Sequence, residues 1–296
     1  MERPHNRICV RLVGGLGNQL FQAAAGMCAA HRLNAKLIFD ISSYKTDKRR
    51  TYELEPFAHE AQILDCATPS VFDYWRLLQP SRKSVPPNWN GKIWQQSGFT
   101  YDDEFEQILP NTYLIGYFQS PNYFSGIEPL VRKAFNLEPL CSEIGRKWQD
   151  SIQTNSAPVI GIHLRRGDFI SDPKAAKVHN ALDYHYYKLA TYIARRLAGA
   201  KARFMVVSDD HGAAKEFFSH LDDIDIVTGT NMFDDMHLLG QCHYRIIANS
   251  SFSWWAAWLG NQETSGLTIA PRWWFTRQRM MHTPTCDLTP DGWVIV

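Results

Sequence analysis

The chain has 296 residues, of which 45% are hydrophobic, so it can bury the cores of about two domains of ordinary size. Its 31 Lys and Arg residues balance 30 Asp and Glu residues. The formal net charge of +1 excludes a global field that would attract nucleic acid or an anionic membrane, so any anion-binding site must be local.

Targeting and redox signals favour a cytoplasmic protein. The N-terminus lacks the basic start and apolar stretch of a signal peptide, and no run approaches the roughly 20 apolar residues of a membrane span. We therefore expect no transmembrane segment. The six cysteines are scattered without a C-x-x-C pair, which argues against a disulfide framework and against a metal site.

The first half of the chain begins as an α/β domain. We predict a strand over residues 8–13, a glycine turn, a helix from about residue 18 to residue 33, and a strand over residues 36–39. Residues 42–110 give no assignable pattern, and a further strand is predicted over residues 112–118.

The second half alternates strands and helices more regularly. Its predicted strands cover residues 159–164, 203–207, 224–227, 244–248 and 267–270, and its helical segments lie around residues 184–197, 212–220, 233–242 and 251–259. We predict an α/β protein with two Rossmann-like domains, residues 1–150 and 151–296, that meet near residues 140–158.

The segment RLVGGLGNQLF carries the glycine turn of the first half. Gly15 and Gly17 would let backbone N–H groups and a positive helix end approach a phosphate or a sugar. A tight turn that needs glycine only for its backbone angles is the alternative. Asn18 and Gln19 follow, and Asn18 either caps the helix or faces a ligand. The third glycine of a dinucleotide-binding motif is missing, although Asp40 lies where a ribose-binding acid would be.

Charged groups follow the predicted strand at residues 159–164. Side chains alternate along a strand, so His163 and Arg165 share one face at its carboxyl end, where open α/β sheets bind ligands. Arg165 offers a fork of donors that suits a phosphate, whereas Arg166 points the other way and is predicted to be structural. Asp168 could pair with either arginine, and an ion-pair network without a ligand is the alternative.

The next strand ends in the segment VVSDDHG. Ser208 and Asp209 lie at its carboxyl end, where the Asp209 carboxylate could accept two hydrogen bonds from the N1–H and N2–H₂ edge of guanine. A metal-binding pair of acids is a competing interpretation, and Asp210 could simply cap the following helix.

The segment HYRIIANSSFSWWAAWLG passes from a strand into a helix. Asn249, Ser250 and Ser251 form a second helix start that could bind an anion through N–H groups and hydroxyls. The three tryptophans that follow are predicted to pack in the core, because a helix that is apolar all round is buried.

Several motifs resemble one known family in their order and spacing. The segments GGLGNQLFQ, LIGYFQSPNYF, GIHLRRGDF, SDD and DDMHLLGQCHYRIIANSSFSWWAAWLG are similar to those of the α-1,2-fucosyltransferases of glycosyltransferase family 11, and the match touches most of the chain. The resemblance implies a GT-B-like fold, with two Rossmann-like domains facing each other across a cleft. It also implies a bacterial-type soluble enzyme that moves fucose from GDP-β-L-fucose to the 2-hydroxyl of a terminal galactose, with inversion and without a metal.

The resemblance assigns donor-site roles to residues of the C-terminal domain. His163 and Arg165 would hold the pyrophosphate, Asp209 would hold the guanine, and Ser250 and Ser251 would contact phosphate or ribose. The partners implied are GDP-fucose and a galactose-terminated oligosaccharide or glycolipid.

The N-terminal domain is assigned the acceptor side by the same resemblance. Asn18 and Gln19, with the turn at residues 15–17, would close the cleft from that domain. Residues 42–110 resemble the family least, which leaves the choice of acceptor open.

Charge development sets the expected mechanism. Negative charge grows on the β-phosphate as the anomeric bond breaks, so Arg165 would stabilise the transition state where other transferases use a divalent ion. Asp168 and His163 are the candidate bases for the acceptor hydroxyl. Two alternatives stay open, namely an NAD(P)-dependent oxidoreductase, which Asp40 would permit, and a nucleotide-binding module without turnover.

Overall fold

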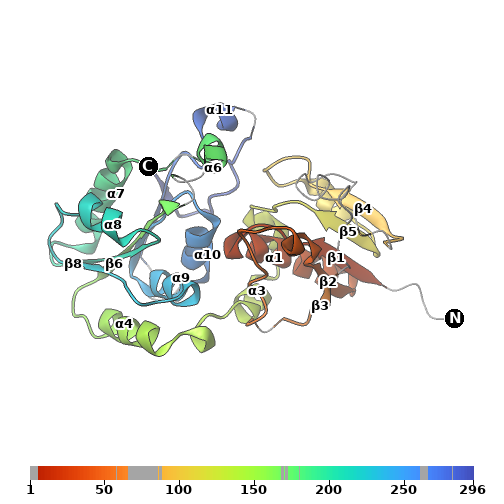
Figure 1. Cartoon of the computed structure of the whole chain (residues 1–296), viewed down its shortest axis with the longest axis horizontal. Coiled ribbons are helices and arrows are strands. Elements are labelled where there is room, and N and C mark those ends of the chain that lie inside the picture. The colour runs from red at the N-terminus through yellow and green to blue at the C-terminus, as the bar shows by residue number, and fades with distance from the viewer. Residues whose placement is uncertain are drawn as a thin grey trace. The chain divides into compact units, whose positions relative to one another are not determined.

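Two parallel β-sheets, each in a unit of its own, form the framework of the protein (Figure 1). The computed structural model describes residues 6–57, 59–65, 86, 89–167, 170, 173–179, 181–260, 266–281 and 283–296. Unit 1 comprises Met1–Phe135 and Pro284–Leu288, and unit 2 comprises Asn136–Thr283 and Thr289–Val296. Helices cover both sheets, so the predicted α/β class with two Rossmann-like domains is confirmed.

Within its described residues, unit 1 contains a five-stranded sheet in the order β3-β2-β1-β5-β4, and the pairings are parallel. The strands are β1 (Arg7–Arg11), β2 (Lys36–Asp40), β3 (Gln62–Leu64), β4 (Lys92–Gln95) and β5 (Thr112–Ile115). The helices are α1 (Leu16–Leu33) and α3 (Glu128–Ala134), with 3₁₀ turns η1 (Ser42–Lys45), η3 (Asp103–Gln107) and η4 (Pro121–Phe124). The sequence pattern did not reveal β3 and β4, because both are short and lie in the irregular segment.

The chain bends sharply directly after β5. We predicted a strand over residues 112–118, but β5 ends at Ile115. Phe118 has a φ of +53°, in the left-handed region that only glycine adopts readily, so the extended chain cannot continue through it. The predicted strand was therefore too long at its carboxyl end.

Helix α1 packs closely against the sheet of unit 1. Small side chains make this possible, since a Cβ added to Gly26 would lie 3.0 Å from the Leu37 side chain and 3.2 Å from the Val10 side chain. Asn34 ends the helix in the left-handed conformation, with a φ of 48°. Although α1 is largely buried and apolar, no helix among the described residues is long and apolar enough to span a lipid bilayer.

The described part of unit 2 contains a six-stranded sheet in the order β11-β10-β9-β6-β7-β8, again with parallel pairings. The strands are β6 (Val159–Leu164), β7 (Arg203–Ser208), β8 (Ile224–Ile226), β9 (Tyr244–Ile246), β10 (Thr268–Ala270) and β11 (Val294–Ile295). The helices are α4 (Glu143–Gln153), α6 (Pro173–Val178), α7 (Tyr184–Ala198), α8 (His211–Phe217), α9 (Met232–Gln241), α10 (Ser251–Leu259) and α11 (Arg277–Met280), with the 3₁₀ turn η5 (Glu138–Leu140). The five strands predicted for this half are all present, and β11 is an addition.

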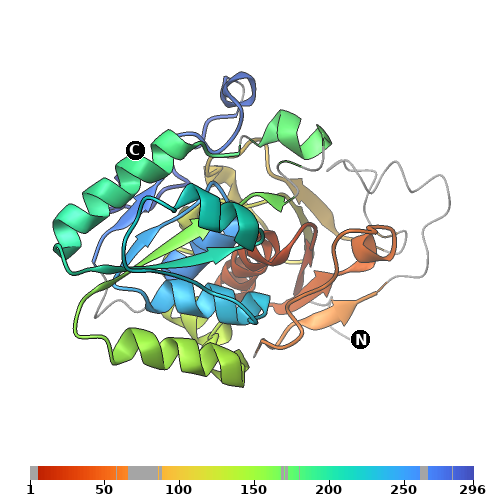
Figure 2. The same ribbon diagram turned by 60° about the vertical axis from the view of Figure 1, so that its left-hand side comes forward.

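Helices sandwich the sheet of unit 2. Ile160, Ile162 and Leu164 of β6 pack in a core with α7 and α8, whereas Val159 packs on the other side with α4 and α9. Figure 2 shows α4 on the side of the sheet opposite α7. The alternation along β6 therefore turns its odd-numbered side chains away from α7 and α8, as predicted.

The division between the units lies at Phe135 and Asn136, N-terminal to the predicted division at residue 150. Helix α4 belongs to unit 2 because Asp234 of α9 accepts hydrogen bonds from the N–H of Ser142 and from its hydroxyl, each at 2.7 Å. Near the C-terminus, Pro284–Leu288 returns to unit 1, where the Asp287 carboxylate accepts the N–H of Tyr101. Neither unit is therefore one continuous stretch of sequence.

Candidate active site

His163 lies at the carboxyl end of β6, buried in unit 2. Its side chain is 3% exposed, and its ring centre lies 5.4 Å from that of Phe252 in α10. None of the described residues hydrogen-bonds to its buried Nδ1. Burial, assisted by the nearby positive charge of Arg165, lowers the pKa of His163 to about 3, so the imidazole is neutral at physiological pH.

Replacing His163 with Gln is expected to flatten the pH dependence of stability. Between pH 6.5 and pH 3 the unfolded chain binds a proton at this residue and the folded protein does not, so acid selectively destabilises the wild type. From pH 7 to pH 5 the wild type should lose about 2 kcal/mol more unfolding free energy than H163Q. Urea denaturation at both pH values measures the difference. The exposed His185 gives a control in H185Q, and equal pH profiles for wild type and H163Q would contradict a neutral buried imidazole.

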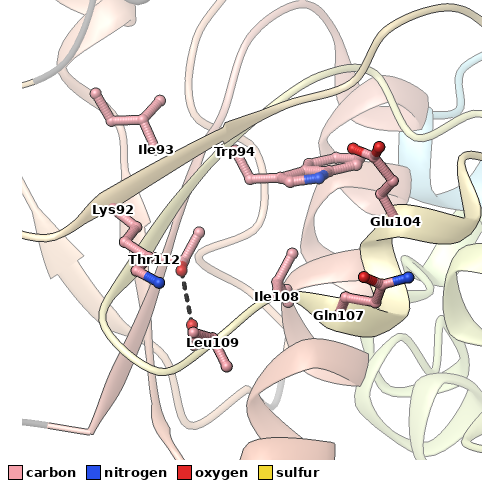
Figure 3. Close-up of a pocket in the computed structure, with 8 residues that line it drawn as sticks. All are labelled: Lys92, Ile93, Trp94, Glu104, Gln107, Ile108, Leu109 and Thr112. Carbon is pink, nitrogen blue, oxygen red and sulfur yellow. Dashed lines mark hydrogen bonds between the residues drawn. The ribbon is translucent and has the colours of Figure 1, made fainter.

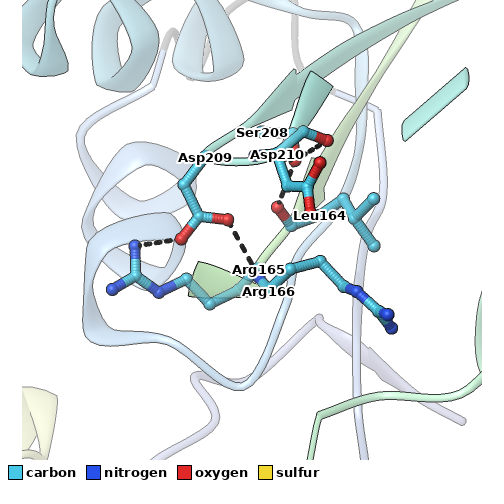
Figure 4. A network of polar contacts seen from close by, with 6 residues as sticks. All are labelled: Leu164, Arg165, Arg166, Ser208, Asp209 and Asp210. Atoms are coloured by element: carbon cyan, nitrogen blue, oxygen red, sulfur yellow. Dashed lines mark hydrogen bonds and ion pairs between the residues drawn. The ribbon is translucent and has the colours of Figure 1, made fainter. Parts of the chain in front are cut away.

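Arg165 and Asp209 form an ion pair at the ends of adjacent strands (Figure 4). Nη1 of Arg165 lies 2.8 Å from Oδ2 of Asp209, and Oδ1 of Asp209 accepts the N–H of Arg166 at 2.9 Å. A Cβ added to Gly167 would lie 2.5 Å from Oδ2 of Asp209, so this turn fits tightly around the carboxylate. The pair is partly exposed, and a guanidinium at such a position is a typical partner of a phosphate or carboxylate.

The two oxygens of Asp209 thus have partners within unit 2. A carboxylate that already accepts from Arg165 and from the N–H of Arg166 is a poorer free acceptor for a guanine edge. The geometry favours a role for Asp209 in positioning Arg165 over the guanine contact that the family resemblance implies.

Arg166 points away from Arg165 (Figure 4), and it packs on Phe217 of α8. Its guanidinium carbon lies 4.8 Å from the centre of the Phe217 ring, and its Nε is buried. This packing agrees with the structural role that the alternation of β6 predicts.

Ser208 and Asp210 have local structural partners. The hydroxyl of Ser208 donates to the carbonyl of Leu164 at 2.9 Å and accepts the N–H of Asp210 at 3.0 Å, so it ties the ends of β6 and β7 together. Asp210 caps α8 by accepting the N–H of Ala213 at 2.9 Å. These bonds favour structural roles for both side chains and account for Ser208 without a ligand.

The start of α10 retains the features of an anion site. Ser250 occupies the N-cap position, and its own side chain makes no capping hydrogen bond. Ser250 and Ser251 are partly exposed, whereas the Asn249 amide is buried and donates to the carbonyl of Trp274 at 3.1 Å. A helix start with two serines suits a phosphate, while the geometry favours a structural role for Asn249.

The tryptophans of α10 pack as predicted. Trp254 and Trp255 are fully buried, and Trp254 stacks on Trp258 with ring centres 6.1 Å apart and an angle of 11°. Trp293 adds to the same cluster at 5.7 Å from Trp254. These rings hold α10 against the body of unit 2 and keep its first turn in place.

The glycine turn of unit 1 differs from a phosphate-binding loop. Gly14 has a φ of +81° and is the glycine that the backbone requires, whereas Gly15 is extended. At the start of α1, the N–H of Leu16 hydrogen-bonds to the Glu53 carboxylate, which opposes the burial that raises the pKa of this group. The helix start thus already faces a carboxylate of its own unit, which disfavours a phosphate there.

Gln19 is committed inside unit 1. Its Nε2 donates to the carbonyls of Gly14 and Thr51 at 3.0 and 2.8 Å, and its Oε1 accepts the N–H of Glu53 at 2.9 Å. The side chain is fully buried. These bonds favour a structural role over the ligand contact implied by resemblance, and Gly17 is likewise buried in the first turn of α1.

Asn18 does not cap α1, whose N-cap is Gly15, but pairs with Gln119. Its Oδ1 accepts a hydrogen bond of 2.7 Å from Nε2 of Gln119, and its Nδ2 lies directly against Gly14. Both amides are partly exposed at the carboxyl end of the unit 1 sheet. Asn18 therefore keeps the ligand-facing option, with Gln119 as a neighbour that the sequence did not indicate.

Asp40 cannot serve as a ribose-binding acid in this arrangement. It is buried, with Oδ1 accepting the N–H of Ser42 at 2.9 Å and Oδ2 accepting the Tyr113 hydroxyl at 2.5 Å. Burial, with the charge of Asp40 as the next cause, raises the pKa of Tyr113 well above its usual value, so the phenol stays a donor. The alternative of an NAD(P)-dependent oxidoreductase therefore lacks the acid that would bind the ribose.

Asp168 lies outside the described residues, so its predicted pairing and catalytic roles stay predictions.

A cavity of about 340 Å³ lies beside β4, lined by residues that include Lys92, Trp94 and Thr112 (Figure 3). Lys92 and Thr112 begin their strands, so this cavity lies at the amino end of the sheet, opposite to the end where such sheets bind ligands.

Comparisons with known proteins give the family. The model of Glycosyl transferase family 11 matches residues 87–295. The chain is 32% identical over 306 residues to an "Alpha-1,2-colitosyltransferase" of Escherichia coli, covering 97% of this chain and 98% of that protein. It is 27% identical to the "O-antigen biosynthesis glycosyltransferase WbnK" of Escherichia coli, covering 96% and 98%. It is 24% identical to "Galactoside 2-alpha-L-fucosyltransferase Sec1" of Mus musculus, covering 86% and 65%.

Solved structures support the fold. The NodZ α-1,6-fucosyltransferase soaked with GDP-fucose aligns with a TM-score of 0.51 at 16% identity, over 88% of this chain and 97% of that one. The NodZ structure from Bradyrhizobium gives the same TM-score over 87% and 94%. The fold is GT-B-like, with two Rossmann-like units. From its motifs, its fold and its relatives, the chain belongs to glycosyl transferase family 11.

Proposed function

We propose that this glycosyltransferase moves L-fucose from GDP-β-L-fucose to the 2-hydroxyl of a terminal galactose, with inversion of the anomeric centre. The observation that carries the proposal is Arg165, which lies at the carboxyl end of β6 and is oriented by Asp209. This is the end of a parallel sheet that binds ligands, and a guanidinium there suits a diphosphate. The acceptor would be a galactose-terminated oligosaccharide or glycolipid.

Arg165 would contact the departing β-phosphate from unit 2. As the anomeric bond breaks, negative charge grows on that phosphate, and a donor that is already oriented stabilises the transition state without reorganising. The N–H groups at the start of α10, with Ser250 and Ser251, would share the phosphates. His163, being neutral, would supply a hydrogen bond rather than a charge.

The donor belongs on unit 2 in this proposal. The Glu53 carboxylate faces the start of α1 and would repel a phosphate, and the first turn of α10 carries no acidic residue of its own. Unit 1 would then receive the acceptor, as the family resemblance implies.

His163 is a poor candidate for the base that removes the acceptor proton. Burial lowers its pKa to about 3, far below the pH at which a general base works best. Asp168 keeps its candidacy, and loss of the proton late along an oxocarbenium-like path would lessen the need for a strong base.

Colitose is the second candidate sugar, because a relative with 32% identity is named as an α-1,2-colitosyltransferase. Colitose is fucose without the 3-hydroxyl, so the two donors share the GDP group and differ at one position of the sugar. A site that hydrogen-bonds that hydroxyl rejects the deoxy sugar strongly, whereas an apolar site discriminates weakly.

We expect purified protein to release GDP from GDP-fucose when a galactoside is added. The screen pairs GDP-fucose and GDP-colitose with lactose, N-acetyllactosamine and its β-1,3-linked isomer, and it identifies the linkage of the product by NMR. We expect kcat/KM for GDP-fucose to exceed that for GDP-colitose by at least about tenfold. The reverse order would replace fucose by colitose as the proposed sugar, and GDP binding without release from either donor would favour the non-catalytic module.

We expect the protein to keep its transferase activity in excess EDTA. Loss of activity in EDTA that manganese restores would contradict a metal-independent reaction.

A further inference from the structure

The bend after β5 is built to hold one conformation. A Cβ added to Gly116 would lie 2.7 Å from the Gln96 side chain, so a larger residue does not fit. Oε1 of Gln96 accepts the N–H groups of Tyr117 and Phe118 at 3.0 and 2.9 Å. Phe118 keeps its left-handed backbone because its ring is fully buried, 5.2 Å from the ring of Tyr123. Strained backbone held in this way is concentrated at ligand-binding sites.

This bend presents an aromatic pair and an amide pair at the carboxyl end of the unit 1 sheet. Tyr117 is 36% exposed, and its ring stacks on that of Phe99 with centres 5.8 Å apart and an angle of 24°. Two residues later, Gln119 donates to Asn18 at 2.7 Å. We call these four residues the Tyr117 platform.

The platform adjoins the glycine turn after β1. Tyr44 donates its hydroxyl to the carbonyl of Gly14 at 3.0 Å, and Asn18 lies against the same glycine. The phenols of Tyr44 and Tyr117 are close enough to interact electrostatically. Aromatic faces, phenols and amides therefore gather where β1 and β5 end, and the four residues of the platform are uncharged.

Resting on the proposed function, we propose that the Tyr117 platform binds the terminal galactose of the acceptor. One face of a galactose ring is lined by C–H groups and packs on an aromatic ring, while its hydroxyls need donors and acceptors such as primary amides. Rigid aromatic side chains and a few convergent polar groups are typical of binding sites for small neutral ligands. The neutral platform contrasts with the cationic Arg165, as an uncharged acceptor and a diphosphate donor require.

We expect Y117A to raise the KM for lactose by about tenfold, which corresponds to 1.4 kcal/mol, while the KM for GDP-fucose stays within about twofold. Y117F keeps the ring and should retain most of the acceptor affinity. Q119A removes an amide without touching the bend and should raise the same KM. Tyr192, an exposed tyrosine of α7, gives the matched control Y192A, which should leave both KM values unchanged.

Saturation-transfer NMR of lactose with each protein provides a readout that does not depend on turnover. Signal on the galactose protons with the wild type, lost in Y117A and kept in Y192A, supports the platform. An unchanged acceptor KM and unchanged NMR signal in Y117A and Q119A would overturn it while leaving the fucosyltransferase proposal intact. Wild-type protein that binds lactose through Tyr117 but releases no GDP would instead overturn the proposed function.

Discussion

R165A is expected to lower kcat by about 10²- to 10³-fold and to weaken GDP binding, because in the proposed reaction it removes the cation that would stabilise the departing phosphate. Arg165 lies at the carboxyl end of β6 with one N–H group on Asp209 and a partly exposed guanidinium. R165K should recover only part of the activity, because an ammonium group lacks the planar fork of donors. Steady-state kinetics of GDP release and calorimetric titration with GDP measure the two effects.

The neighbouring R166A is the matched control. Arg166 packs on Phe217, so its loss should lower the melting temperature and change kcat by no more than about twofold. A kcat of R165A within tenfold of the wild type would show that Arg165 serves only its ion pair. A larger loss of kcat in R166A than in R165A would reverse the roles assigned to the two arginines.

D234A is expected to cause the largest loss of stability. Asp234 is fully buried, and its carboxylate accepts hydrogen bonds from Ser142 and from the N–H of Asn231 at 3.1 Å. Removing it leaves the three donors of these partly buried hydrogen bonds without their acceptor and releases α4 from α9, which should cost about 3 kcal/mol. The unfolding transition of unit 2 should fall by about 10 °C. Differential scanning calorimetry measures it, with the exposed Asp222 as control in D222A.

The pH dependence of this difference gives a second test. Burial raises the pKa of Asp234, but the hydrogen bonds from Ser142 and Asn231 outweigh it and lower the pKa below the usual value of 3.8. The stabilisation is therefore present above pH 3.8 and is lost as the pH falls through the lower folded value. The gap between wild type and D234A should persist from pH 7 to pH 5 and narrow below pH 4. A gap that does not change with pH would contradict an ionised Asp234.

Short-range pattern was sufficient for the part of the site that lies on β6. Alternation placed Leu164 and Arg166 on the face opposite to Arg165, and the structure agrees, with Leu164 in the core and Arg166 packed on Phe217. The sequence offered Asp168 as a partner of either arginine but did not indicate the ion pair of Arg165 with Asp209, because that pair depends on register. Strands β6 and β7 pair Leu164 with Ser208, which sets Arg165 beside Asp209, and no local pattern encodes how two parallel strands slide past each other.

In unit 1, contacts between residues distant in the sequence determine the roles of the glycine turn and of Gln19, which the sequence alone could not predict. The glycine turn looks like a phosphate loop locally, but Glu53, from an irregular segment without periodicity, reaches the same helix start. Gln19 resembles a ligand-binding residue in the sequence, but its side chain hydrogen-bonds to the backbone of Gly14, Thr51 and Glu53. A motif predicts the local backbone conformation, but residues distant in the sequence decide whether a ligand can bind there.

The return of Pro284–Leu288 to unit 1 has a consequence for engineering this family. In a chimaera with one splice point near residue 135, Tyr101 and the segment around residue 287 would come from different proteins. The hydrogen bond from the N–H of Tyr101 to Asp287 would then depend on the residue that the other protein has at that position. To exchange unit 1 between homologues, a chimaera therefore needs two further junctions, one on each side of Pro284–Leu288. The transferred unit then keeps its own Asp287 carboxylate together with Tyr101.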